Sequence, residues 1–245
     1  MDQTILGKFV DPAVYAAQEE RGLISQHLGR AGGTFVEVGA YDAVFQSQTH
    51  HLELIGWNGL LVEPVPEFAD NLRRSRRAAV RQCACVSPEM AVAERVAMLE
   101  RRGNSTTRFD PRKVRPDENV IEVPAATLDS ILEDAGISHV DFLSVDVEGA
   151  EPEVLKGFDL MRFRPRLVLV DDRERFGETC RVLRGSNFRL MRRTGHNAWF
   201  VPAESGFAPS TRGRAQLAWT YGIGRFLRRR TRPRSGAHRL SSRPD

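Results

Sequence analysis

Cysteine is scarce in this sequence, and long apolar runs are absent. The 3 cysteines are Cys83, Cys85 and Cys180, an odd and sparse set that argues against a disulfide framework and is typical of a reducing compartment. Cys83 and Cys85 form a C-x-C pair without a second Cys/His pair at zinc spacing, so we interpret them as strand residues. No window has the length of a membrane-spanning helix, and the first residues lack the basic and apolar regions of a signal peptide. We therefore expect a cytoplasmic protein that contacts the inner face of a membrane peripherally at most.

A glycine-rich phosphate loop is missing as well. The turn in "EVGAYDA", residues 37–43, matches neither G-x-G-x-x-G nor the P-loop pattern, which weakens the case for a phosphate cradle. Its single glycine, Gly39, still leaves a predicted strand at a tight turn. We expect a side chain at this position to block the close approach of a ligand to the backbone.

Basic charge is concentrated at one end of the chain. The net charge is +4, but residues 225–245 hold eight arginines and one aspartate, so this segment carries +7 and the rest carries −3. A segment so rich in arginine, serine and proline is typical of disorder. Two roles stay open for it: contact with anionic lipid headgroups or nucleic acid, or a solvated tail without a specific partner.

Apolar strands alternate with helical patterns along the chain. Strands are predicted at 34–40, 59–64, 78–87, 142–147 and 166–172, and two short ones at 188–193 and 197–202. Helices are predicted at 11–29, 47–56, 66–75, 127–136, 152–158 and 174–185, with Thr127 as an N-cap, whereas residues 88–126 are ambiguous. The strands are continuous apolar runs, which favours a mostly parallel sheet with helices on both faces. We expect a helical lead-in at 1–32, an α/β domain at 33–205 and a basic, disordered tail at 206–245.

Three predicted strands end in glycine or a carboxylate: "VEVGA", "LLVEP" and "LSVDVEG". In an open α/β sheet these ends meet along the edge where ligands bind. Glu63 follows Gly39 by about 20 residues, a spacing at which a carboxylate accepts hydrogen bonds from both hydroxyls of a ribose. Asp146 and Glu148 leave the third of these strands, whereas we assign Glu151 only a favourable interaction with a helix dipole. The edge therefore suits a nucleoside without phosphates, and the usual one is S-adenosylmethionine.

At this point the sequence resembles the FkbM-type methyltransferases, a family within the class I S-adenosylmethionine-dependent enzymes. The resemblance runs from about Thr34 to Arg173 and is carried by "FVEVGAYDA", "SQTHHLELIGWNGLLVEPVPEFADNLRRSR", "CACVS", "TLDSIL" and "VDFLSVDVEGAEPEVLKGFD". It implies a Rossmann-like seven-stranded sheet, with an antiparallel strand near the C-terminal end, for a methyltransferase domain at 33–205. It also implies O-methylation of sugars or other hydroxyl-bearing natural products.

The resemblance also implies roles for individual residues. The methionine end of the cofactor would be lined by four residues around the first turn: Glu37, Gly39, Ala40 and Asp42. Glu63 would hold the ribose, and Cys85 and Val86 would flank the adenine. Asp146 and Glu148 would face the methyl group and the acceptor, and Asp146 would also contact the cofactor. Ser47 and Thr49 match a polar pair of the family pattern, so contact with the cofactor carboxylate and a helix N-cap role both stay open.

Two positions depart from the family pattern. Ala43 stands where glycine is usual, and the strand "LVLV" ends in Asp171–Asp172 where a single glutamate is usual. These departures bear on the geometry of the cofactor site more than on the family itself.

Methyl transfer to a hydroxyl requires the acceptor to be held in line and to lose a proton. We predict Asp146 as the first choice for base or orienting group, and Glu148 as the second. The same two carboxylates suit Mg²⁺, although we do not expect a required metal and assign no metal ligands. His50, His51 and His196 are the other candidate bases, each with a surface, packing or turn role as the alternative. Trp57 is interpreted as a packing residue.

The predicted function is therefore S-adenosylmethionine-dependent O-methylation of a sugar, glycolipid or secondary metabolite. Two alternatives stay open. One is an RNA methyltransferase that uses the arginine-rich tail, although the acidic body and the lack of an added RNA-binding module speak against nucleic acid as a partner. The other is a non-catalytic nucleoside-binding protein on the same fold. The tail at 225–245 also suits peripheral contact with an anionic membrane. The acceptor and the oligomeric state do not follow from the sequence.

Overall fold

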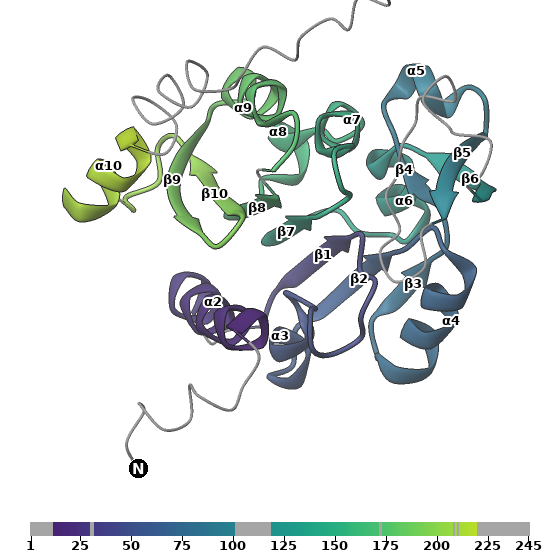
Figure 1. The fold of residues 1–245 in the computed structure, drawn as a ribbon, viewed down its shortest axis with the longest axis horizontal. Coiled ribbons are helices and arrows are strands. Elements are labelled where there is room, and N and C mark those ends of the chain that lie inside the picture. The colour runs from purple at the N-terminus through teal and green to yellow at the C-terminus, as the bar shows by residue number, and fades with distance from the viewer. Residues whose placement is uncertain are drawn as a thin grey trace, which may run out of the picture. The chain divides into compact units, whose positions relative to one another are not determined.

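The computed structural model describes residues 12–29, 32–100, 119–171, 173–207, 209 and 211–219 (Figure 1). The chain divides into two units, 1–207 and 208–245. The second unit contains helix α10, Thr211–Leu217, which lies within the range expected to form a disordered tail. The arginine-rich segment 225–245 lies outside the described residues. Within the described residues, no helix is both long enough and apolar enough to cross a bilayer.

The first unit is built on a seven-stranded sheet in the order β3-β2-β1-β7-β8-β10-β9. Its strands are β1 Thr34–Val38, β2 Asn58–Val62, β3 Ala79–Arg81, β7 Phe142–Val145, β8 Leu167–Asp171, β9 Phe188–Thr194 and β10 Asn197–Pro202. Neighbouring strands from β3 to β8 run parallel, whereas β10 is antiparallel to both β8 and β9. The predicted fold class, including the antiparallel strand near the C-terminal end, is confirmed.

The central parallel strands are buried on both faces of the sheet. All four residues of β7 and all five residues of β8 are buried, and only the first residue of β1 is partly exposed. Such strands need a cover on each side of the sheet. The continuous apolar runs therefore correctly predicted a sheet that is covered on both faces.

Helices provide this cover on both faces of the sheet (Figure 1). Helices α2 and α3 lie on one side, and α7, α8 and α9 lie on the other. The helices of the first unit are α2 Pro12–Leu28, α3 His50–Leu54, α4 Pro66–Ser75, α5 Pro88–Ala91, α6 Leu128–Asp134, α7 Glu151–Lys156, α8 Leu160–Phe163 and α9 Phe176–Gly185. The expected N-cap of α6 is present, since the Thr127 hydroxyl accepts a hydrogen bond from the backbone N–H of Ser130. Proline at the first position of α4 likewise starts that helix where the sequence predicts.

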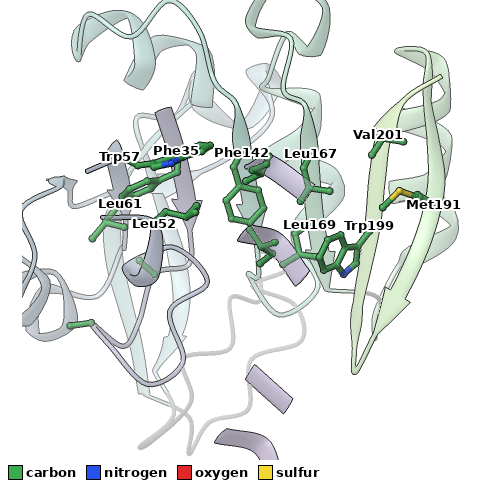
Figure 2. Packing of buried hydrophobic residues seen from close by; sticks show 14 of the residues in the cluster. Phe35, Leu52, Trp57, Leu61, Phe142, Leu167, Leu169, Met191, Trp199 and Val201 are labelled. Atoms are coloured by element: carbon green, nitrogen blue, oxygen red, sulfur yellow. The ribbon is translucent and has the colours of Figure 1, made fainter. Parts of the chain in front are cut away.

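One apolar core joins the sheet to α2, α3 and α4 (Figure 2). Its large members are Ile24, Leu28, Phe35, Leu52, Trp57, Leu61, Leu72, Phe142, Leu167, Leu169, Met191, Trp199 and Val201. Trp57 is 2% exposed, and a Cβ atom at Gly33 would lie 2.6 Å from its ring, so the indole packs directly on the backbone. The predicted packing role of Trp57 is confirmed.

The predicted single strand at 78–87 is wrong, because two short strands occupy it. β3 extends the main sheet, whereas β4, Ala84–Cys85, pairs with β6, Asn119–Ala126, in a separate three-stranded sheet. β6 also pairs with β5, Arg95–Glu100, in antiparallel fashion. The ambiguous region 88–126 thus forms this second sheet, with residues 101–118 outside the described ranges. Arg81 and Gln82 interrupt the apolar segment between the two strands, but its composition does not reveal that its two halves have different partners.

Candidate functional site

The candidate site begins where four parallel strands end side by side. Four valines lie in register across β2, β1, β7 and β8: Val62, Val38, Val145 and Val170. The residue after each valine is, in the same order, Glu63, Gly39, Asp146 and Asp171. Three of these strand ends were predicted to meet at one edge, and the structure brings them together as adjacent positions. The sheet therefore presents a row of three carboxylates and one glycine at its carboxyl edge.

A cavity opens above this row. Its lining consists of Glu37, Val38, Gly39, Ala40, Tyr41, Gln46, Gln48, Glu63, Pro64, Met98, Ser144, Asp146, Val147, Glu148 and Asn197. Four of these residues are acidic, and none of the described lining residues is lysine, arginine or histidine. The cavity therefore favours a neutral or positively charged ligand over an anionic one.

Glu63 lies in the cavity wall with only 3% of its surface exposed. Its Oε2 atom accepts a hydrogen bond from the Tyr41 N–H at 2.9 Å, and its Oε1 atom accepts one from the Val65 N–H at 2.9 Å. Burial raises the pKa of Glu63, and these two hydrogen bonds oppose the rise. Each carboxylate oxygen has a second lone pair for a ligand hydroxyl. The arrangement fits a pair of neighbouring hydroxyl groups such as those of a ribose.

Gly39 is required by the chain that leaves the neighbouring strand β7. Its φ is +82°, and a Cβ atom at this position would lie 1.9 Å from the carbonyl oxygen of Asp146. The glycine therefore lets the chain leave β1 directly against the chain leaving β7. Gly39 also lines the cavity, and the expectation that a side chain here would block the approach of a ligand stays a prediction.

Asp146 stands at the cavity wall with about half of its side-chain surface (50%) exposed. Desolvation by the surrounding protein raises its pKa to about 7, and the negative charges of Asp171 and Glu148 add to the rise. Arg173 opposes it: its guanidinium lies 3.6 Å from Asp146, 2.9 Å from Glu148 and 2.7 Å from Asp171. One arginine thus forms ion pairs with three carboxylates. The sequence analysis did not single out Arg173, because nothing in its spacing distinguishes it from the other arginines.

Glu148 and Glu151 belong to one tight turn. Glu148 has a left-handed backbone conformation, with φ +53°. The Oε1 atom of Glu151 accepts hydrogen bonds from the N–H groups of Val147 and Gly149 at 3.2 and 2.9 Å, which fixes the turn that carries Glu148. Glu151 is 1% exposed, and burial raises its pKa to about 7. The predicted role of Glu151, a favourable interaction with the helix dipole, is therefore incomplete. Its carboxyl group also fixes the turn that carries Glu148.

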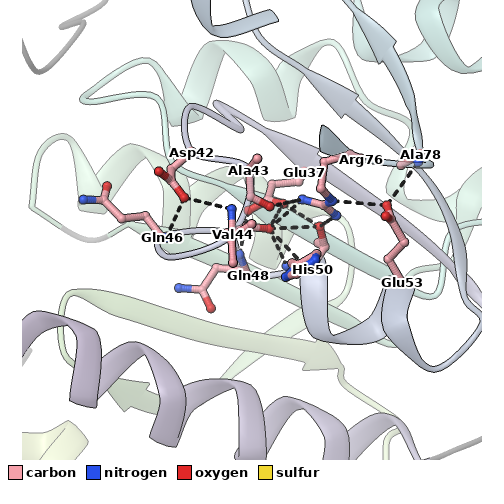
Figure 3. A network of polar contacts seen from close by, with 12 residues as sticks. Glu37, Asp42, Ala43, Val44, Gln46, Gln48, His50, Glu53, Arg76 and Ala78 are labelled. Atoms are coloured by element: carbon pink, nitrogen blue, oxygen red, sulfur yellow. Dashed lines mark hydrogen bonds and ion pairs between the residues drawn. The ribbon is translucent and has the colours of Figure 1, made fainter. Parts of the chain in front are cut away.

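Glu37 lies beneath the loop that follows β1 (Figure 3). Its Oε1 atom accepts a hydrogen bond from the Gln48 N–H at 2.7 Å, and its Oε2 atom accepts hydrogen bonds from the hydroxyls of Ser47 and Thr49. Burial raises the pKa of Glu37, while these partners and Arg76 lower it. Ser47 and Thr49 are themselves buried, and the Thr49 side chain makes no N-cap hydrogen bond to α3. In this structure, Glu37, Ser47 and Thr49 hold the loop together.

The remaining predicted cofactor residues divide into two groups. Ala40 lines the cavity, next to Gly39. Asp42, Cys85 and Val86 are outside its lining: Asp42 accepts hydrogen bonds from the Val44 and Phe45 N–H groups, and the other two are buried. The lining residues that the sequence did not single out include Met98, which comes from β5, Gln48 and Asn197. The sequence did not mark Met98, because residues 88–126 show no clear helix or strand pattern.

The two departures from the family pattern are accommodated. Ala43 is buried and is not among the described residues with a positive φ, so this turn does not demand glycine. Asp171 is buried and accepts hydrogen bonds from the backbone and the side chain of Arg173. Asp172 lies outside the described residues.

The three histidines considered as bases are all outside the cavity lining. Burial lowers the pKa of His50 and lowers that of His51 to about 4, and His196 is exposed. Among the described residues, neither ring nitrogen of His51 has a hydrogen-bond partner. The carboxylates are therefore the titratable groups that the cavity offers.

Residues 37–192 match the methyltransferase FkbM domain. The match covers more than half of the chain and includes β2, β7 and β8 in full. It begins at Glu37, within β1, and ends before Asn197 of β10. The chain belongs to the FkbM methyltransferase family. This FkbM protein is accordingly an S-adenosylmethionine-dependent methyltransferase. No curated protein matches the chain.

Several solved methyltransferase structures match the FkbM chain at low sequence identity. The precorrin-6y C5,15-methyltransferase of Geobacter metallireducens is 11% identical, covers 75% of this chain and 86% of its own, and has a TM-score of 0.41. The O-methyltransferase of Bacillus cereus in complex with SAH is 12% identical, covers 78% and 80%, and also scores 0.41. Human methyltransferase-like protein 13 in complex with SAH is 16% identical, covers 93% of both chains and scores 0.38. These scores are low, so the family assignment rests on the domain match.

Proposed function

We propose that this protein transfers a methyl group from S-adenosylmethionine to a hydroxyl group of a sugar, glycolipid or secondary metabolite. The observation that carries the proposal is the acidic cavity at the strand ends, with Glu63 in one part of its wall and Asp146 in another. A cavity lined by carboxylates and carboxamides suits a polyhydroxylated acceptor, because each of these groups accepts hydrogen bonds from hydroxyls.

The residues present fit the cofactor. Glu63 has a free lone pair on each oxygen for the ribose hydroxyls, and Gly39 and Ala40 bring backbone to the cavity surface. When bound, S-adenosylmethionine supplies a sulfonium methyl group, which is electrophilic and positively charged. The four carboxylates of the lining favour that positive charge, whereas they disfavour a phosphorylated ligand.

Asp146 is our candidate for the residue that receives the acceptor proton. A general base works best when its pKa lies near the operating pH, and the pKa of Asp146 is raised to about 7. Arg173 limits that rise and holds Glu148 by an ion pair, so Glu148 is better placed to orient the acceptor than to take its proton. The same guanidinium supplies positive charge to the two carboxylates considered as Mg²⁺ ligands.

A neutral hydroxyl acceptor is preferred here to RNA. An RNA strand would bring phosphates to a cavity whose described lining carries four carboxylates and no basic side chain. The arginine-rich segment on which the RNA alternative depends lies outside the described residues.

The proposal is tested by calorimetric titration with S-adenosylmethionine. We expect micromolar binding by the native protein and a loss of at least tenfold in affinity for Glu63→Ala, because the variant lacks both acceptors for the ribose. The control is Glu67→Ala, which removes an exposed carboxylate from the same segment and should bind normally. Failure of the native protein to bind would favour a non-catalytic protein on this fold.

A further inference from the structure

Arg76 is a buried arginine for which cofactor chemistry has no direct use. It is the C-cap residue of α4, and its side chain is 0% exposed. It is not part of the cavity lining. Arginine is almost never fully buried unless it is paired, so this position demands an explanation.

The guanidinium of Arg76 bridges three parts of the chain (Figure 3). It donates hydrogen bonds to the Ala43 carbonyl at 3.2 Å, to the Ser47 hydroxyl at 3.0 Å and to the Thr49 hydroxyl at 3.0 Å. Its Nε atom also donates to Glu53 of α3 at 3.2 Å. Three of these four contacts go to the loop 43–49.

The same loop is held by two further groups. Glu37, in β1, accepts hydrogen bonds from Ser47, Gln48 and Thr49, and lies 4.0 Å from Arg76. Arg21, in α2, donates to the backbone carbonyls of the loop at positions 44, 45 and 47. Hydrogen bonds to Arg76, Glu37 and Arg21 thus hold the loop in place. Two of its residues, Gln46 and Gln48, line the cavity.

We infer that Arg76 is a positioning residue that sets the loop 43–49 in the form required to bind the amino-acid portion of the cofactor. This inference rests on the proposed function. Glu63 holds the ribose at one part of the cavity wall, and Gln46 and Gln48 line another, so the methionine carboxylate and ammonium depend on the loop whereas the nucleoside does not.

Stabilisation of the fold is a weak explanation for the burial of Arg76. An arginine buried between Glu37 and Glu53 loses its hydration, and replacing such pairs by apolar side chains is often neutral or stabilising. A guanidinium is instead suited to fixing geometry, because its planar fork directs several N–H groups at once. Lysine retains the positive charge that both buried carboxylates need, but it cannot reproduce that fork.

The test is the comparison of two ligands with Arg76→Lys. S-Adenosylhomocysteine contains the amino-acid portion, whereas 5′-methylthioadenosine lacks it. We expect the variant to bind S-adenosylhomocysteine at least tenfold more weakly and to bind 5′-methylthioadenosine within twofold of the native protein. Thr49→Val, which removes one hydroxyl bound by Arg76, should show the same selectivity to a smaller degree and serves if Arg76→Lys does not fold. The control is Arg73→Lys, three residues earlier on α4 and exposed, which should affect neither ligand.

The outcomes separate this inference from the proposed function. Equal weakening of both ligands, or none, in a folded variant would overturn the positioning role and leave cofactor binding intact. Failure of the native protein to bind either ligand would overturn the proposed function, and the inference with it.

Discussion

Glu151 is a buried carboxyl group whose protonation is strongly altered by its surroundings. Its carboxylate is buried, one oxygen accepts two backbone N–H groups, and the other has no hydrogen-bond partner among the described residues. Desolvation raises its pKa from 4.5 to about 7. The folded protein therefore holds the proton on Glu151 more tightly than the unfolded chain does.

This pKa shift predicts how stability depends on pH. A group with a raised folded-state pKa contributes stability below its unfolded pKa of about 4.5, and that contribution is lost as pH rises through about 7. Glu151→Gln should therefore lose less unfolding free energy than the native protein when pH is raised from 5 to 8. We expect the difference to be on the order of 3 kcal/mol. Urea denaturation at both pH values measures it.

Glu153→Gln is the matched control on the same helix. The pKa of Glu153 is lowered, with Arg175 and Lys156 as its hydrogen-bond partners, so its contribution to stability appears as pH rises. That contribution is essentially complete above its unfolded pKa of about 4.5, so Glu153→Gln should leave the loss of stability between pH 5 and pH 8 unchanged. An unchanged pH dependence in Glu151→Gln would contradict the assigned state of that carboxyl group.

At the scale of single residues, the sequence predicted the acids at the strand ends but not the arginines that organise them. Glu63, Asp146 and Glu148 follow apolar strands, and that position marks them. Arg76 and Arg173 occur in charged stretches, where spacing cannot separate a buried arginine from a solvated one. Their roles depend on contacts between distant segments, which only the folded chain defines.

At the scale of elements, the junction between β1 and β7 determines the shape of the site. The two strands are neighbours in the sheet, and their chains leave it in close contact at Gly39 and Asp146. A small displacement of either chain would therefore move Asp146, the candidate base, together with the turn at Gly39.

We therefore expect Gly39→Ala to be strongly destabilising. The substitution combines a φ of +82° with a Cβ atom 1.9 Å from the Asp146 carbonyl oxygen, so the cost should exceed the roughly 1–2 kcal/mol of a left-handed alanine alone. Gly136→Ala isolates that backbone cost, because its φ is +69° and nothing lies within 4 Å of the added atom. Equal losses of unfolding free energy in the two variants would show that the contact with Asp146 is unimportant.

Element prediction succeeded where a segment's partner did not matter. Proline and Thr127 mark the starts of α4 and α6, and apolar runs mark β1, β2, β7 and β8. It failed at 78–87, because the two halves of that run pair with β2 and with β6. Composition records burial but not which strand provides the hydrogen bonds.

At the scale of the whole molecule, charge is divided unevenly. The chain carries +4 in total, of which residues 225–245 contribute +7. We propose that this segment draws the enzyme to anionic membranes, as would suit a lipid-linked acceptor. Each arginine near such a surface contributes about 1 kcal/mol, and salt screens the attraction.

Vesicle co-sedimentation tests this proposal. The full chain should bind anionic vesicles more tightly than neutral ones, and the difference should shrink as salt is raised. Deletion of residues 225–245 should abolish the preference while leaving affinity for S-adenosylmethionine unchanged. Equal binding of the full chain to both vesicle types would rule out the membrane role.

The row of strand ends also has a consequence for the order of events during synthesis. Val38 must pair with Val145, and Val145 with Val170, so the two halves of the cavity wall are made more than a hundred residues apart. A ribosome that has completed β1, β2 and β3 has produced Glu63 but not Asp146 and Glu148, which line the same cavity. Contacts of such long sequence separation form slowly, because the loop between them must close first. The described cavity lining is complete only when Asn197, the first residue of β10, has been made, so a nascent chain should capture ligand only after translation has passed that residue.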